Sequence, residues 1–479
     1  MRVTEPVGHL RRVAVIGGGV SGLAAAYHLR ELDPQIDVVL FESAPRLGGV
    51  LHTVHEQGFQ VEQSADNFIT TVPWGLDLCR RLGLDDELVQ TNPAHRRTFV
   101  VRRGRLHKLP DGFLMMAPSR FWPLALTPIL SPWGKMRAAA EYFLPPRRDG
   151  SDESMAGFVR RRLGREVFQR LVEPLVSAVY AADMEKLSLL ATLPRFRQME
   201  QAHGSLIRAM QQARKAHDRP EGQSGARYSL FVTLRRGLTS LVEAIAQRLP
   251  PGAVRLGTEV ERIQRREGRW VVRVGHGGQE ETFDGLIVAT PAYAAARLLE
   301  PIDPELGRLL AGIPYEGTAV LSVAYRREQI THPLDGMGFV VPAIERSPIL
   351  AGSFSSQKYV HRAPEGLELL RIFAGGARAP EMAEWGPDEL ESRLLPELAR
   401  LLGIRGEPVY HATARWPRTM PQYHVGHLEV VQRIRSHVAA LANLQLAGNA
   451  YQGVGIPHCI HSGEEAAEGL LRPRRPEVR

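Results

Sequence analysis

The stretch 13–30 constrains the fold of this chain more than any other. Its apolar, β-branched start, 13–16, predicts a buried strand, and an alanine-rich helix is expected to begin at Ser21. The three glycines between them, 17–19, combine with Gly22 to give the spacing G-x-G-x-x-G. In this pattern the glycines permit a tight turn, close approach of a pyrophosphate, and close contact between helix and strand. Because a helix N-terminus presents free N–H groups to phosphate, the stretch predicts a dinucleotide site.

A second strand and a carboxylate strengthen this prediction. The apolar run 38–41 ends in Glu42, which lies 20 positions after Gly22. A carboxylate at this spacing hydrogen-bonds the ribose hydroxyls of a dinucleotide. The alternative is a glycine-rich turn that holds no ligand, and the following strand with its terminal carboxylate argues against it. Arg46 comes shortly afterwards, just before a second glycine pair, Gly48-Gly49.

An acidic strand end followed by Arg-x-Gly-Gly resembles the flavoproteins that include amine oxidases, phytoene desaturases and protoporphyrinogen oxidases. The resemblance implies that the second glycine pair lets the backbone approach FAD. Two later segments narrow the family. Residues 415–427 contain W-x-x-x-x-P-Q-Y-x-x-G-H, which is similar to a signature of protoporphyrinogen and coproporphyrinogen oxidases, and residues 453–460 resemble their C-terminal flavin loop. With the N-terminal motif, the resemblance spans nearly the whole chain.

The resemblance implies one FAD, held without a covalent bond, and oxidation of a porphyrinogen to a porphyrin in haem synthesis, with O2 as acceptor. It also implies an α/β fold with a discontinuous, Rossmann-like FAD-binding domain of three layers, a substrate domain built on a mixed sheet, and a helical insertion. We therefore expect the FAD-binding domain at 10–95, 226–298 and 433–472, a helical substrate- or membrane-facing domain at 96–225, and the substrate-binding sheet domain at 299–432.

The matched motifs assign a set of FAD-binding residues. They are Gly17, Gly18, Gly19, Val20, Ser21, Gly22, Glu42, Ser43, Arg46, Gly49, Val50, Ala65, Asp66, Asn67, Val260, Trp416, Gly448, Val454, Gly455 and Ile456. One stretch departs from the family pattern, because Ser64-Ala-Asp-Asn67 stands where many relatives have Gly-Pro-x-Ser. We expect the backbone of this loop still to contact the flavin, while the departure leaves the choice of substrate open.

A carboxylate anchor for the substrate is expected near the hairpin 98–109. In the family, an arginine just before the strand at 99–101 takes this role, and Arg97 matches it best, with Arg96 as the second candidate. A bidentate guanidinium suits the task, although a solvated surface arginine is the alternative. No catalytic triad or metal cluster stands out, so no general base is assigned. The flavin is expected to carry the oxidation.

Two porphyrinogens remain as substrates. Coproporphyrinogen III has four propionates, whereas protoporphyrinogen IX has two propionates and two vinyl groups. The similarity of the loop 453–457 to the bacterial form favours coproporphyrinogen III, as do extra cations in the hairpin, which could equally be solvated. Those cations are Arg96, Arg97, Arg102, Arg103, Arg105 and Lys108. The rival functions are a flavin amine oxidase, a carotenoid-desaturase-like dehydrogenase, and an FAD-bound partner protein without activity.

Charge and cysteine content bear on partners and compartment. The net charge is +8 at pH 7, but the arginines are scattered and no binding motif accompanies them, so nucleic acid is not an expected partner. Cys79 and Cys459 have neither disulfide nor metal spacing, which favours a reducing compartment. No signal peptide is visible, and no apolar run is long enough to span a membrane. We expect a cytoplasmic protein, with peripheral contact at the inner face of the membrane as an option.

Residues 113–135 are unusually apolar and are interrupted by four prolines. Because proline breaks helices, we expect short apolar helical pieces. These pieces either face the access path of the porphyrinogen and a membrane surface, or cover a core beneath neighbouring helices. A further expected partner is the downstream enzyme that takes the porphyrin, of ferrochelatase type.

Overall fold

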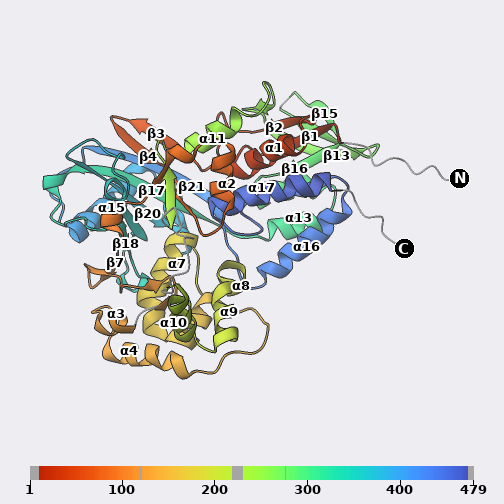
Figure 1. The fold of residues 1–479 in the computed structure, drawn as a ribbon. Helices are drawn as coiled ribbons and strands as arrows, with labels where there is room; N and C mark the ends of the chain where they lie inside the picture. Colours follow the sequence, from red (N-terminus) through yellow and green to blue (C-terminus); the bar gives the residue numbers. More distant parts are fainter. Residues whose placement is uncertain (1–9, 119–120, 218–229, 276, 473–479) are drawn as a thin grey trace.

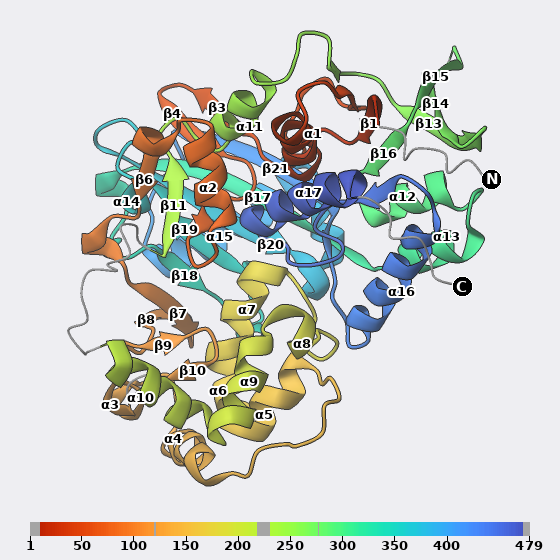
Figure 2. The ribbon, with the colours of Figure 1, turned by 45° about the vertical axis from the view of Figure 1, so that its right-hand side comes forward.

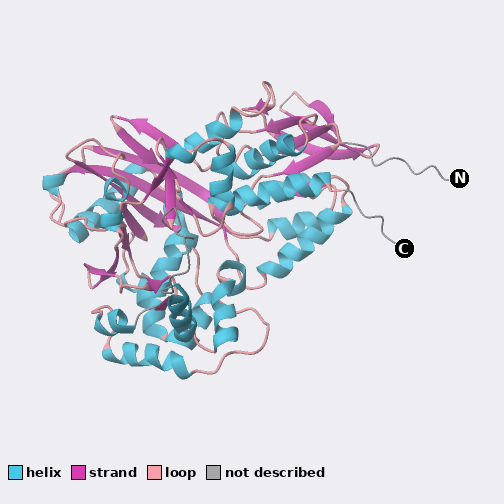
Figure 3. Cartoon of the chain, in the orientation of Figure 1, coloured by secondary structure: helices cyan, strands magenta, loops and turns pink. Residues whose placement is uncertain are grey.

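The computed structural model describes residues 10–118, 121–217, 230–275 and 277–472. Figure 1 shows three parts: an α/β part that contains the first and the last elements, a large sheet beside it, and a helical part below the two. Figure 2 gives a second view, and Figure 3 separates helices from strands. The buried side chains form separate clusters in these parts.

The α/β part is organised around a five-stranded parallel sheet. Its central strands are short, β-branched apolar runs, which is typical of strands that are buried on both faces. The order is β12-β2-β1-β16-β22, so the strand that leads into the glycine turn lies at the centre. The strands are β1 (Arg12–Ile16), β2 (Asp37–Phe41), β12 (Val254–Arg255), β16 (Gly285–Val288) and β22 (Leu444–Leu446).

Two further layers cover the faces of this sheet. Val13 and Val15 pack toward one layer, whereas Ala14 and Ile16 pack toward the other, as the alternation along a strand requires. The first layer consists of α1 (Val20–Leu32), α2 (Trp74–Arg81), α11 (Thr239–Ala246) and α17 (Ile456–Leu471). The second consists of β13 (Val260–Arg266), β14 (Arg269–Val274), β15 (Gln279–Phe283), α12 (Ala292–Leu299), α13 (Pro304–Ala311) and α16 (His427–Ala440). The predicted three-layer, Rossmann-like domain is confirmed.

The second part is a seven-stranded sheet of order β21-β17-β20-β19-β18-β7-β8. It is mixed, because β7 runs parallel to β18 while the other neighbours are antiparallel. One face packs against the amphipathic helix α15 (Pro387–Leu402). The strands are β7 (Thr98–Arg102), β8 (Arg105–Lys108), β17 (Tyr315–Arg326), β18 (Gly338–Val340), β19 (Ala351–Phe354), β20 (Leu367–Gly375) and β21 (Tyr410–Pro421).

Short elements join the α/β part to the seven-stranded sheet. Phe59 and Val61 pack against Ala324 and Leu369 of the sheet, so the hairpin that carries them ties the two parts together. The short elements are β3 (Thr53–Glu56), β4 (Phe59–Glu62), β5 (Phe68–Ile69), β6 (Leu88–Gln90), β11 (Phe231–Leu234) and α14 (Ser355–Lys358).

The helical part is inserted between β8 and β11. Among the described residues, no helix is both long enough and apolar enough to cross a membrane. Its elements are β9 (Phe113–Leu114), β10 (Ala117–Pro118), α3 (Phe121–Leu126), α4 (Pro132–Ala139), α5 (Met155–Leu163), α6 (Arg165–Val167), α7 (Glu173–Tyr180), α8 (Leu189–Thr192), α9 (Pro194–His203) and α10 (Leu206–His217).

The structure moves two of the predicted domain boundaries. The hairpin β7–β8, which was assigned to the helical domain 96–225, forms the edge of the seven-stranded sheet, because β7 pairs with β18. Helix α13 falls in the predicted sheet domain 299–432 but packs with α16 in the α/β part. The pairing of β7 with a distant strand and the packing of α13 against a distant helix decide to which domain each belongs. Neither contact leaves a signal in the local sequence pattern.

The apolar segment 113–135 divides between core and surface. Its buried members belong to the core of the helical part, as the core alternative expects, and they are Phe113, Met116, Leu124, Ile129 and Leu130. Trp122, Leu126 and Trp133 are each more than 70% exposed, at 74%, 77% and 78%. None of the described residues of this segment lines the cavity that is described below. The structure therefore does not support the expectation that the segment borders the substrate path.

A buried ion pair holds the helical part together. The Glu141 carboxylate accepts a hydrogen bond from Nε of Arg162 at 2.9 Å, and both side chains are fully buried. The same carboxylate accepts the Ser205 hydroxyl at 2.6 Å and the backbone N–H of Leu206 at 2.8 Å, at the start of α10. One carboxylate thus joins α5 and α10 to the segment after α4.

Replacing this carboxylate by a neutral amide should destabilise the protein. Glu141→Gln removes the nearer of the two buried carboxylates that face Arg162 and leaves only Glu200, at 3.5 Å from Nη1. Breaking a buried pair costs about 3–5 kcal/mol of unfolding free energy. Urea unfolding followed by circular dichroism measures the loss. Asp149→Asn, which removes an exposed ion pair with Arg147 in the same part, is the control and should leave the unfolding midpoint unchanged. Equal unfolding midpoints for the two variants would contradict the stabilising role of the Glu141 carboxylate.

Candidate active site

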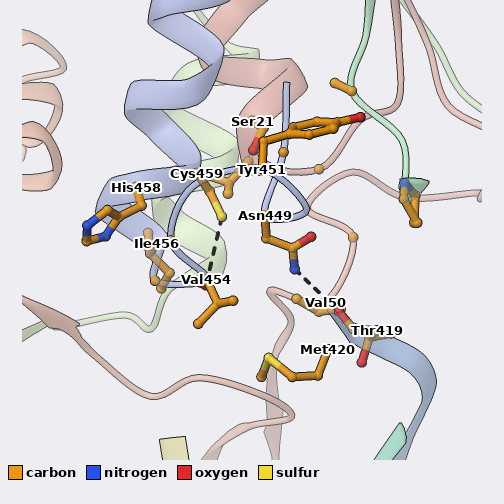
Figure 4. Close-up of a pocket in the computed structure, with 18 of the residues that line it drawn as sticks. Ser21, Val50, Thr419, Met420, Asn449, Tyr451, Val454, Ile456, His458 and Cys459 are labelled. Atoms are coloured by element: carbon orange, nitrogen blue, oxygen red, sulfur yellow. Dashed lines mark hydrogen bonds between the residues drawn. The ribbon is translucent and has the colours of Figure 1, made fainter. Parts of the chain in front are cut away.

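A cavity of about 1390 Å³ lies where the three parts meet. Its wall takes residues from the glycine turn of the α/β part, from β17 and β20 of the large sheet, and from the ends of α7 and α8 in the helical part. Figure 4 shows one region of the wall, where Val50, Thr419, Asn449 and Val454 lie around the same space. Segments from the beginning, the middle and the end of the described chain therefore build one site.

The turn between β1 and α1 brings backbone segments into close contact. Gly17 has a φ of +109°, which favours glycine, and a Cβ there would lie 2.7 Å from the carbonyl oxygen of Ala289. A Cβ on Gly22 would collide with the carbonyl oxygen of Gly17. At Gly19, by contrast, nothing lies within 4 Å of the Cβ position, so the N-terminus of α1 is open toward the cavity. This geometry suits a pyrophosphate.

Glu42 fixes this turn at the end of β2. Its carboxylate accepts hydrogen bonds from the backbone N–H groups of Gly18 at 2.6 Å and Ala44 at 2.7 Å. Glu42 also lines the cavity, and so do Ser43 and Val260. The carboxylate therefore orders the two turns that flank a dinucleotide site and faces the space where a ribose would lie.

Two further side chains hold loops beside the cavity. The Arg46 guanidinium donates hydrogen bonds to the carbonyl oxygens of Gly49 at 2.7 Å and Leu47 at 3.1 Å. The indole N–H of Trp416, on β21, donates to the carbonyl oxygen of Gln63 at 2.6 Å. These contacts hold backbone at or next to the wall, which Gly49 and Ser64 line.

The signature at 415–427 supports the C-terminal loop. The Tyr423 ring stacks on His427 with ring centres 4.2 Å apart, and its hydroxyl donates to the carbonyl oxygen of Asn449. Burial lowers the pKa of His427 to about 4, so this ring is neutral at physiological pH. Beyond Asn449, the glycine-containing loop leads into α17, whose first residue, Ile456, lines the cavity. The signature thus positions a helix N-terminus rather than supplying a reacting group.

Comparison with known proteins identifies the family. The flavin-containing amine oxidoreductase family matches residues 20–471. The chain belongs to this family. It is 33% identical to the coproporphyrinogen III oxidase of Bacillus subtilis, over 96% of this chain and 98% of that protein. It is 30% identical to protoporphyrinogen oxidase 1, chloroplastic, of Arabidopsis thaliana, over 95% of this chain and 86% of that protein.

A solved structure extends the comparison. The crystal structure of a proposed protoporphyrinogen oxidase from Exiguobacterium sp. matches with a TM-score of 0.85 at 31% identity, and covers 96% of this chain and 98% of that one. The resemblance to the porphyrinogen-oxidase group is confirmed. Family membership implies a flavin cofactor, and the residues fit one, because the open space at Gly19 adjoins a helix N-terminus and an acidic strand end.

Most of the predicted FAD-binding residues line the cavity. They are Gly17, Gly19, Val20, Ser21, Glu42, Ser43, Gly49, Val50, Ala65, Asp66, Asn67, Val260, Trp416, Gly448, Val454, Gly455 and Ile456. Gly18, Gly22 and Arg46 do not line it and act behind the wall. Gly18 donates to Glu42, Gly22 permits the close approach of α1 to β1, and Arg46 holds the second glycine pair. Direct contact with the flavin stays a prediction for every residue of the set.

The structure does not bring Arg97 to the cavity. Its side chain is 54% exposed and forms an ion pair with Asp335 at 2.9 Å. Arg97 precedes β7, which lies near one edge of the seven-stranded sheet, whereas the cavity borders β17 and β20. Arg96 is exposed as well. Because their strand lies on the far side of the sheet, neither arginine is retained as the carboxylate anchor of this cavity.

An apolar arm of the cavity was missed by the sequence analysis. Its lining residues are Val179, Tyr180, Ala181, Leu190, Thr318, Val320, Leu350, Phe373 and Met420. Thr318 and Val320 share one face of β17, as period-two alternation requires. The alternation shows that β17 has two faces but not which of them meets the ligand, and the contribution of α7 depends on how the insertion docks.

A buried charged cluster behind the cavity was also missed. Nζ of Lys358 lies 3.0 and 3.1 Å from the two carboxylate oxygens of Asp66, and Nη1 of Arg371 lies 3.5 Å from Oδ2. Arg371 is 1% exposed and also donates to the carbonyl oxygen of Ser64. Burial alone would raise the pKa of Asp66, but the charges of Lys358 and Arg371 outweigh it and hold this pKa below its ordinary value.

Removing the Glu42 carboxylate should weaken flavin binding. In Glu42→Ala the backbone N–H groups of Gly18 and Ala44 lose their acceptor, which costs about 1–3 kcal/mol, and a ribose contact is lost with it. The ratio of flavin absorbance to protein absorbance after dilution and gel filtration measures the loss. Asp37→Ala, at the exposed end of the same strand, is the control. Full flavin occupancy in Glu42→Ala would show that this carboxylate is not needed.

Proposed function

We propose that this protein is an FAD-dependent porphyrinogen oxidase of haem biosynthesis that oxidises coproporphyrinogen III to coproporphyrin III with O2 as acceptor. The observation that carries the proposal is the near-complete match to proteins named coproporphyrinogen III oxidase in Bacillus subtilis and Staphylococcus aureus, at 33% and 31% identity. The glycine turn and Glu42 favour a dinucleotide form of the flavin, because the acidic strand end suits an adenosine ribose.

The lining of the cavity has the polarity that this reaction needs. The ring system of a porphyrinogen is apolar and favours an apolar wall, and Val320, Leu350 and Phe373 provide one beside the dinucleotide region. When bound, the flavin would supply the acceptor for the hydride that leaves each reacting carbon. The apolar residues of the wall would exclude water and hold the macrocycle against the flavin ring. The six-electron oxidation removes three hydrides and three protons.

The choice of coproporphyrinogen III as the substrate now rests on the names of the relatives. The hairpin cations that favoured it in the sequence do not reach the cavity, since Arg97 and Lys108 both lie near Asp335 on the surface. Plant relatives named protoporphyrinogen oxidase are also similar, at 30% identity or below in the examples compared. The flavin amine oxidase alternative does not account for the Pro-Gln-Tyr signature at 421–423.

Two measurements on the unmodified protein test this function. Anaerobic addition of coproporphyrinogen III should bleach the oxidised flavin absorbance, and aerobic turnover should give a higher kcat/KM for coproporphyrinogen III than for protoporphyrinogen IX. The expected preference rests on the bacterial relatives, which are named coproporphyrinogen III oxidase. A preference for the divinyl compound would reassign the substrate. Bleaching by a primary amine, with none by either porphyrinogen, would support the amine oxidase instead.

We also propose peripheral membrane contact through an exposed apolar patch of the helical part. The patch consists of Trp122, Leu126, Trp133, Met136 and Phe143, which are between 62% and 81% exposed. Figures 1 and 2 place α3 and α4 side by side at the end of the helical part that is farthest from the α/β part. Tryptophan favours the membrane interface, and Lys135 and Arg208 beside the patch suit anionic headgroups at the cytoplasmic face.

The triple variant Trp122→Ser, Trp133→Ser, Phe143→Ser tests this contact. Flotation with vesicles that contain anionic lipid should carry the unmodified protein and lose most of the variant, because the variant loses its exposed apolar area. Turnover with the porphyrinogen should be unchanged, since none of these side chains lines the cavity. If neither protein floats, the membrane proposal is wrong. Capture of a ferrochelatase-type enzyme through the patch, without flotation, would assign the patch to that partner.

A further inference from the structure

One carboxylate in the apolar end of the cavity has no task so far. Of the carboxylates that line the cavity in the described chain, Glu42, Glu259 and Glu261 lie at the dinucleotide end, at or near the ends of β2 and β13. Asp66 lies elsewhere, in a loop held against β20, the strand that carries Phe373 of the apolar wall. The backbone of the Asp66 loop is an expected flavin contact, which leaves the side chain unassigned.

The side chain of Asp66 retains room for one more donor. A carboxylate offers about four lone-pair sites. Oδ1 accepts from Lys358 at 3.0 Å and from the amide of Asn67 at 2.7 Å. Oδ2 accepts from Lys358 at 3.1 Å, while Arg371, at 3.5 Å from Oδ2, lies beyond a good hydrogen bond. The Asp66 side chain is 13% exposed, and Asp66 lines the cavity.

The two cations keep this group acceptor-only. A lone carboxylate in an apolar wall would take up a proton and could then donate as well as accept. Lys358 and Arg371 come from α14 and β20 of the large sheet and approach Asp66 from behind the wall. The cavity therefore meets a carboxylate that can only accept hydrogen bonds.

The tetrapyrrole changes its hydrogen-bonding character during oxidation. A porphyrinogen presents four pyrrole N–H donors and no nitrogen acceptor. The porphyrin product presents two N–H groups and two imine nitrogens whose lone pairs repel a carboxylate. The sp3 meso carbons let the pyrroles of a porphyrinogen tilt, so that their N–H groups can point toward one face of the macrocycle. A fixed acceptor over that face therefore binds the substrate better than the product.

We propose that Asp66 accepts hydrogen bonds from the pyrrole N–H groups of the reduced tetrapyrrole and so discriminates substrate from product, with Lys358 and Arg371 as the positioning residues behind it. This inference rests on the proposed function, because it takes the porphyrinogen as the ligand of the apolar arm. Oxidation of the porphyrinogen removes two of the four donors, and this loss favours release of the porphyrin.

Asp66→Asn tests the proposal with two binding constants that should move in opposite directions. The amide keeps the shape but loses the charge and presents a donor. KM for the porphyrinogen should rise by about tenfold or more, as expected for a lost charged hydrogen bond. The dissociation constant of the porphyrin product, measured by fluorescence titration of the flavin-loaded enzyme, should fall. Parallel changes in both constants would indicate a structural role, and no change in either would overturn the proposal.

Because Asp66→Asn leaves the buried Lys358 unpaired, the double variant Asp66→Asn, Lys358→Met removes the pair together. In this double variant KM for the porphyrinogen should again rise and the dissociation constant of the porphyrin should again fall. The variant should keep its flavin, which is read from absorbance. Lys108→Met, at an exposed lysine of the β7–β8 hairpin, is the matched control and should change neither constant. If the unmodified enzyme oxidises no porphyrinogen, the proposed function fails and this inference with it. If it does so and Asp66→Asn binds both ligands normally, the inference alone fails.

Discussion

Close packing of backbone around the glycine turn is the constraint on which the rest of this structure depends. Helix α1 approaches β1 so closely that a Cβ on Gly22 would collide with the carbonyl oxygen of Gly17. Helix α17 approaches α1 in the same way, since a Cβ on Gly463 would collide with the carbonyl oxygen of Ser21. Any larger side chain at these positions would push a helix off the sheet and close or distort the phosphate end of the cavity.

The flavin end of the site could be predicted from the sequence because its determinants are local. The turn 17–22, the carboxylate at 42 and the loop 453–456 each form a short motif whose geometry follows from glycine conformation and helix termini. The same holds for regular elements such as the amphipathic helix α15, which is preceded by Gly386 and followed by Gly403 with a φ of +63°. Local signals of this kind do not depend on how the domains pack.

The substrate end could not be predicted because it depends on distant contacts. Asp66 and Lys358 meet across 292 positions, and neither residue lies in a motif that marks the other. Arg97 was assigned to the site because it precedes a strand, but the position of that strand within the sheet is set by its pairing with β18. Pairing order and the docking of the helical insertion are tertiary properties, and they alone decide which faces of β17 and β20 meet the ligand.

The order of the strands has a consequence for how the protein matures. The parallel sheet places β1 and β2, which are made early, beside β16 and β22, and α17 follows only after β22. During translation the early βαβ unit therefore emerges with an uncovered apolar face and an incomplete flavin pocket. Chaperones have a long interval in which to meet that face before synthesis reaches α17. Cofactor insertion is consequently tied to completion of the chain, so a ribosome stalled before β22 would carry a nascent chain that cannot retain flavin.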